Sequence, residues 1–159
     1  MRDWLKLIGS SKSPITAPPF NGEYTDEYIG FRRVGKPRIC SGDHLFLYVP
    51  GGSKRIFALA KAVGEAVPDT KYNPREEGSC RWKLRVNYLI NLPVLSGILV
   101  GDIISSQRDL TKSLRQAGHV KLLSEESELA HAKLRERVNS TSCRTSSSDQ
   151  TLCQTLAGA

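Results

Sequence analysis

The chain has 159 residues, a length that fits one domain with a core of its own. Hydrophobic residues make up 39% and charged residues 25%, an ordinary composition for a soluble protein. The net charge of +7 favours polyanionic partners such as nucleic acid, although a solvated basic surface without a partner explains it equally well.

The N-terminal part is predicted to open with a strand over residues 4–8, followed by a loop over residues 9–22 in which prolines block regular structure. Residues 25–34 are predicted to begin with a helical turn, because Thr25 can cap it. A dense basic run comes next and comprises Arg32, Arg33, Lys36 and Arg38.

Three strands are predicted in the middle of the chain. Residues 44–49 form an apolar run that suits a strand buried on both faces. Residues 55–67 form the next strand, and small side chains on one of its faces allow another backbone or a flat ligand to come close. Residues 80–90 alternate clearly, which predicts a half-buried strand with a basic solvent face. That solvent face carries Arg81, Lys83, Arg85 and Asn87, and the core face carries Trp82, Leu84, Val86 and Tyr88.

The C-terminal part is predicted to contain a short helix over residues 108–117, ended by Gly118, and a closing strand over residues 119–123. A second helix begins at Ser124. Its packing stripe recurs at every fourth position, at Ala130, Leu134 and Val138.

From residue 139 the composition shifts to Ser and Thr, so residues 139–159 are predicted to be a disordered tail and residues 1–138 the domain. Strands dominate without alternating regularly with helices. We therefore expect an α+β fold, a small barrel of about five to six mostly antiparallel strands with short flanking helices.

Four cysteines, Cys40, Cys80, Cys143 and Cys153, form no C-x-x-C pair, so a zinc knuckle is not expected. The opening residues MRDWLKLIG are too short and too charged for a secretory signal, and no apolar run has the length of a membrane span. We expect free thiols in a reducing, cytoplasmic environment and no contact with a membrane.

No catalytic motif is visible. The three histidines stand apart from any nucleophile or carboxylate motif, and the P-loop, G-x-S-x-G and deaminase signatures are missing from the sequence. We therefore expect no catalytic residue, no metal ligand and no cofactor. The remaining chemistry is recognition, since aromatic rings can stack on a base. The candidate rings are Trp4, Tyr28, Phe31, Tyr48 and Trp82, with core packing as the alternative for each and the favoured one for Tyr48 and Trp82.

The order of the segments resembles the EVE domain, a PUA-like family related to the YTH readers of methylated RNA. In the first half of the chain the resemblance rests on W-L-K-L at residues 4–7, the polar loop with Ser10 and Ser11, Y-I-G-F-R-R at residues 28–33, and G-D-H-L-F-L-Y at residues 42–48 followed by residues 56–69. In the second half it rests on R-W-K-L-R-V at residues 81–86 with Leu92-Pro93 after it, L-R-Q-A-G at residues 114–118 and L-S-E-E at residues 123–126. It covers residues 3–138 and implies a PUA-like barrel with a pocket for a flipped, often modified base. Arg33 stands where the family has Asn.

The expected base pocket combines this resemblance with the local residues. Its members are Trp4, Ser10, Ser11, Tyr28, Gly30, Phe31, Arg32, Arg33 and Trp82. Phosphate contacts are expected from Lys36, Arg38, Arg81, Lys83 and Arg85.

These observations predict a non-catalytic module that binds DNA or RNA and recognises a modified base. The alternative is an accessory subunit that guides a separate RNA- or DNA-modifying or restriction enzyme, because such a subunit would need the same pocket. A hydrolase or nuclease is disfavoured by the missing motifs.

Overall fold

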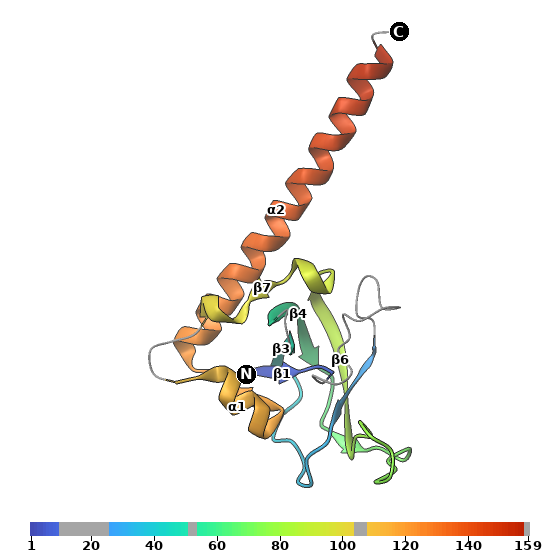
Figure 1. Ribbon diagram of the computed structural model, residues 1–159, viewed down its shortest axis with the longest axis vertical. Helices are drawn as coiled ribbons and strands as arrows, with labels where there is room; N and C mark the ends of the chain where they lie inside the picture. The colour runs from blue at the N-terminus through green and yellow to red at the C-terminus, as the bar shows by residue number, and fades with distance from the viewer. Residues whose placement is uncertain (10–25, 51–53, 104–107, 158–159) are drawn as a thin grey trace.

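The computed structural model describes residues 1–9, 26–50, 54–103 and 108–157. These residues form an α+β fold in which a curled sheet is flanked by two α-helices (Figure 1). The strands are β1 (Asp3–Leu7), β2 (Tyr28–Phe31), β3 (His44–Val49), β4 (Arg55–Ala62), β5 (Val67–Pro68), β6 (Trp82–Asn91), β7 (Ile98–Leu99) and β8 (His119–Lys121). The helices are α1 (Leu110–Ala117) and α2 (Ser124–Ala157), with short 3-10 turns at Val94–Ser96 and Val100–Ile103.

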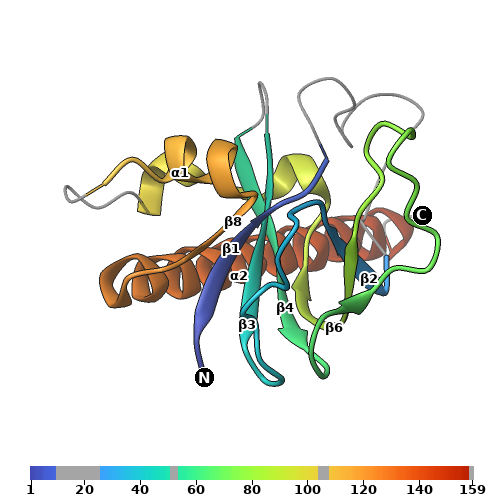
Figure 2. The same cartoon turned by 90° about the horizontal axis from the view of Figure 1, so that it is seen from below.

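The sheet is mixed and has the strand order β2-β6-β4-β3-β1-β8, with β5 paired to β6 and β7 paired to β4. β1 runs parallel to β3 and antiparallel to β8. Figure 2 shows how the strands curl into a half-barrel. The α+β class and the barrel-like curl of the sheet are thus confirmed, whereas the strand path through the described residues ends at β2 and β8 and forms no continuous ring.

The central strands separate two cores. In β3, Leu45 and Leu47 enter the inner core, which lies within the curl, and Phe46 and Tyr48 enter an outer core. The outer core also holds apolar residues of both helices, such as Leu114. The prediction of a strand over residues 44–49 that is buried on both faces is therefore confirmed.

Two local predictions are wrong. The expected strand over residues 55–67 ends at Ala62, since Gly64 adopts a φ of 88° that breaks the extended run, and pairing resumes only at β5. The expected helical turn in residues 25–34 is instead strand β2, because Tyr28–Phe31 pairs with β6. Thr25 itself lies outside the described residues. In the second case the pairing with β6, which the local sequence does not reveal, decides the conformation.

The C-terminal elements follow the predicted order. Gly118 ends α1 with a φ of 74°, and the closing strand β8 pairs with β1. Helix α2 begins at Ser124, and its stripe packs on the outer core through Ala130 and Leu134.

Beyond residue 138, α2 continues as one helix to Ala157, in the segment for which the sequence predicts a disordered tail. Figure 1 shows this part running away from the body of the domain. Hydroxyl groups at Ser140, Thr141 and Ser142 donate to backbone carbonyls four residues earlier, which satisfies them inside a helix. The domain boundary at residue 138 stays a prediction. No helix in the described part of the chain has the length and apolar character needed to cross a membrane.

A close contact across β2 gives the first testable prediction. A Cβ added at Gly30 would lie 2.5 Å from Sγ of Cys80 and 2.9 Å from its Cβ. The side chain of Cys80 therefore fills the space next to Gly30, a residue of the expected base pocket. We expect Gly30→Ala to lower the free energy of unfolding by about 1–3 kcal/mol, measured by urea denaturation. Gly35→Ala is the control, because its Cβ would meet only Arg33, at 3.5 Å. Equal stability of the two variants would contradict the contact.

Candidate functional site

Two edge strands of the sheet bring their side chains together inside the curl. Phe31 of β2 and His119 of β8 lie at opposite ends of the strand order, yet their ring centroids are 5.2 Å apart and the rings meet edge to face. Trp4 lies 5.6 Å from the same His119 ring, and Lys6 places Nζ 4.8 Å from the centroid of Phe31. We call Trp4, Lys6, Phe31 and His119 the seam cluster, since they join the two edges of the half-barrel.

The backbone explains why these groups meet. Side chains two residues apart on a strand share a face, so Trp4 and Lys6 both point into the curl. β8 pairs with β1 in a register that sets His119 opposite Lys6. All four seam residues are buried, with between 2% and 8% of their surface exposed.

Lys6 is the unusual member of the seam cluster, because lysine is almost never fully buried without a partner. Its Nζ donates to the Leu7 carbonyl at 2.7 Å, its one hydrogen bond within the part of the chain that the structure describes. Burial lowers the pKa of Lys6 to about 8; Cys80 acts against this change, and the charge of Arg32 adds to it. At neutral pH the amine is therefore a buried cation that has one hydrogen-bond acceptor among the described residues, although it carries three N–H donors.

His119 is held in its neutral form. Burial and the positive charges of Lys6 and Arg33 together lower the pKa of His119 to about 4, against a hydrogen bond to the Ala117 backbone. A neutral imidazole has one donor and one acceptor nitrogen, so it can contribute hydrogen bonds beside the Lys6 cation without adding charge.

Basic side chains lie near the seam cluster and also on the outer face of β2 and β6. Arg32 and Arg33 follow directly after Phe31, and both act electrostatically on the seam cluster. On the outer face, Nζ of Lys83 lies 5.1 Å from the ring centroid of Tyr28, and Arg81 lies 4.9 Å from that of Tyr72. Tyr28 is 46% exposed, which leaves an aromatic surface next to positive charge.

The pocket residues predicted from the sequence are divided between these two faces. Trp4 and Phe31 lie inside the curl, and the Trp4 indole donates to Asp43 at 3.1 Å. Tyr28 lies on the outer face, and Trp82 is half-buried with its indole donating to the Val34 carbonyl. Ser10 and Ser11 lie outside the described residues.

The predicted phosphate-binding residues differ in how much charge they can offer. Lys36 is paired with Glu65 at 2.7 Å and Arg85 with Glu27 at 2.8 Å, so part of their charge is already neutralised. Arg38 is exposed.

Sequence reasoning missed Lys6 and His119 as site residues. A signal for Lys6 was present, since it interrupts the apolar strand W-L-K-L-I at residues 4–8. His119 carried no such signal, because its position against Lys6 depends on the pairing of β8 with β1.

No family model matches the chain, and no curated protein matches it either. Among solved structures, the chain is similar to the NMR structure of Rpa0253 from Rhodopseudomonas palustris, with a TM-score of 0.48 and 16% identity over 84% of this chain and 93% of that one. It is also similar to the X-ray structure of Atu2648 from Agrobacterium tumefaciens, with a TM-score of 0.49, the same identity and the same coverage. Similarity at this level carries no information on ligand or activity.

Proposed function

We propose that the protein is a PUA-like module that binds DNA or RNA and recognises a modified base without catalysing a reaction on it. The observation that carries this proposal is the buried cation of Lys6 over the Phe31 ring. An ammonium in this position costs folding free energy, so its presence is better explained by a ligand than by packing. Amines donate to the carbonyl oxygens and ring nitrogens that bases carry on their edges.

The charges around the seam support contact with a nucleic-acid backbone. Arg32 and Arg33 are exposed and act electrostatically on Lys6 and His119, so they can hold phosphates next to a base that reaches Lys6. The exposed ring of Tyr28, with Lys83 beside it, offers a stacking surface for a neighbouring base. Stacking and phosphate contacts do not depend on the base sequence of the nucleic acid. In this proposal Lys6 distinguishes the modified base from plain ones.

The nucleic-acid interface predicts a binding constant that falls with salt. We expect Arg33→Ala to weaken binding to plain and modified oligonucleotides alike and to reduce the slope of log K against log salt by about one, because one phosphate contact is lost. The measurement is fluorescence anisotropy with short single-stranded and duplex DNA and RNA at several salt concentrations.

Lys133→Ala is the control for this experiment, because it removes the same charge from an exposed position on α2. The control should keep the salt slope of the parent. Affinity that does not change with salt, or an equal slope for Arg33→Ala and the parent, would show that the basic residues are only a solvated surface.

A further inference from the structure

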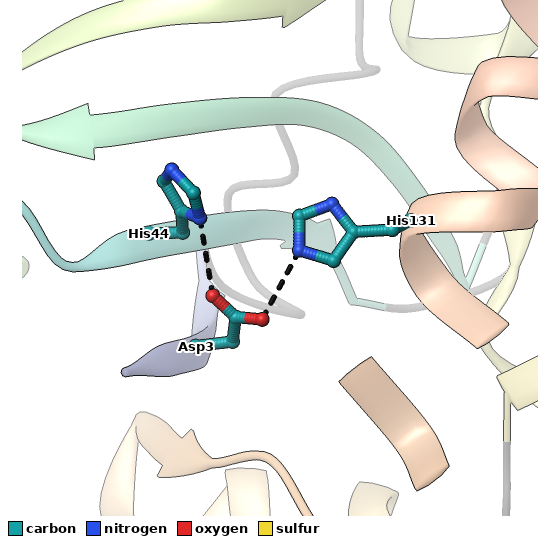
Figure 3. A group of neighbouring side chains, drawn as sticks. All are labelled: Asp3, His44 and His131. Atoms are coloured by element: carbon teal, nitrogen blue, oxygen red, sulfur yellow. Dashed lines mark hydrogen bonds and ion pairs between the residues drawn. The ribbon is translucent and has the colours of Figure 1, made fainter. Parts of the chain in front are cut away.

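A second group of chemically active side chains lies on the opposite face of β1. Asp3 and Leu5 alternate with Trp4 and Lys6, and Leu5 belongs to the outer core, so Asp3 faces away from the seam cluster and toward α2. Figure 3 shows the Asp3 carboxylate between two imidazoles, His44 at the start of β3 and His131 on α2.

The contacts in this group are short and specific. Nδ1 of His44 lies 3.2 Å from Oδ1 of Asp3, and Nε2 of His131 lies 3.0 Å from Oδ2 (Figure 3). Ser127, one helical turn before His131, donates its hydroxyl to the same Oδ2. The backbone places these groups, since β1 and β3 pair with Asp3 opposite His44, and residues four apart on α2 share a face.

The spacing of the three donors suits a tetrahedral metal ion. One donor atom from each of Asp3, His44 and His131 lies within 4.8 Å of the other two. With metal–ligand bonds of about 2.0–2.1 Å, tetrahedral zinc separates neighbouring ligand atoms by about 3.3 Å. The two histidine–carboxylate distances of 3.2 and 3.0 Å are close to that value, although they end on different oxygens of Asp3. A bound ion would replace these two hydrogen bonds, and the two imidazole nitrogens would turn toward it.

The chemistry of the donors selects the ion. Two imidazole nitrogens and one carboxylate oxygen, with no thiolate, favour Zn²⁺ over Ca²⁺ and Mg²⁺, which prefer oxygen ligands.

The surroundings of the three side chains also suit a bound ion. The group is half-buried, with side-chain exposures of 17% for Asp3, 13% for His44 and 23% for His131. The Phe46 ring packs edge-on against His131 at 4.9 Å and excludes solvent on that side.

We propose that Asp3, His44 and His131 form a Zn²⁺ site that fastens α2 to the sheet and leaves a fourth coordination position for water. Ser127 positions the carboxylate through its hydrogen bond to Asp3. This inference is independent of nucleic-acid binding, because the site and the seam cluster occupy opposite faces of β1.

The test is calorimetric titration of the full chain with Zn²⁺ after treatment with a chelator. We expect one ion per chain and a thermal midpoint that rises with zinc concentration, because the ion binds the folded state. His131→Gln should weaken binding about 100-fold or more through loss of a ligand, and Ser127→Ala about 10-fold through loss of a positioning hydrogen bond. Glu128→Gln is the control, since it changes an exposed side chain on the same helix, and should bind zinc as the parent does.

Circular dichroism must first show that each variant keeps its fold, and Asp3→Asn provides a second ligand variant of unchanged size. The visible spectrum of the Co²⁺ complex separates the proposed donors from cysteine, because thiolates add an intense near-ultraviolet charge-transfer band. Absence of stoichiometric zinc binding, equal affinity in His131→Gln and the parent, or a thiolate band in the Co²⁺ complex would each overturn the proposal.

Discussion

Lys6→Met is expected to make the protein more stable at neutral pH, by about 2 kcal/mol. The fall in the pKa of Lys6 from 10.5 to about 8 corresponds to about 3 kcal/mol of unfavourable free energy for the buried cation. Methionine fills a similar volume without the charge. It loses the hydrogen bond to the Leu7 carbonyl and the contact with the Phe31 ring, which together offset about 1 kcal/mol of the gain.

The same substitution changes how stability depends on pH. Because the folded-state pKa of Lys6 lies below its unfolded-state value, the unfolded chain binds more protons between pH 8 and 10.5. Stability of the parent should therefore rise with pH across this range through Lys6, and Lys6→Met should lack this contribution. Urea denaturation at neutral pH and at pH about 10 measures both effects. Lys61→Met, at an exposed position of β4, is the control.

Oligonucleotide binding by Lys6→Met is the next measurement. Lys6→Met should lose discrimination between modified and plain bases while it keeps the salt dependence of the parent. A variant that is less stable than the parent and binds every oligonucleotide unchanged would identify Lys6 as a structural donor and remove the main support for base recognition.

Asp43→Ala is expected to lower the free energy of unfolding by about 3–5 kcal/mol, since a buried acceptor of three hydrogen bonds is lost. Asp43 is 2% exposed. Its carboxylate accepts from the Trp4 indole at 3.1 Å and from the backbone N–H groups of Cys40 at 3.0 Å and Arg2 at 2.9 Å. Alanine would leave these donors without a partner, and through Trp4 it would also loosen the seam cluster.

Acid sensitivity provides the second measurement on Asp43. Burial alone would raise the pKa of Asp43, but hydrogen bonds from Cys40, Trp4 and Arg2 lower it below its ordinary value of 3.8. The stabilisation is thus complete above pH 3.8 and is lost as the pH falls through the folded-state pKa. Asp43→Ala should lack this loss, whereas Asp102→Ala, at an exposed position, should behave as the parent. A variant as stable as this control would show that the three hydrogen bonds contribute little.

Features that depend on neighbouring residues in the sequence could be predicted, whereas contacts between distant segments could not. Alternation in residues 80–90 correctly predicted which side chains of β6 face solvent, because this pattern follows from strand geometry alone. The stripe of α2 and the glycine after α1 followed from equally local rules. Contacts between distant segments could not be predicted in this way. Asp3 meets His131 across 128 positions, and Phe31 meets His119 only because the whole sheet curls.

The position of β1 also determines when the chain can fold during synthesis. Although β1 is made first, it lies between β3 and β8, and Lys6 reaches its partner His119 only after most of the domain has been translated. A sheet with such distant pairings folds slowly, since long loops must close before the contacts form. During synthesis β1 can therefore pair with β3 on one edge early, whereas its other edge stays unpaired until the residues of β8 have been made.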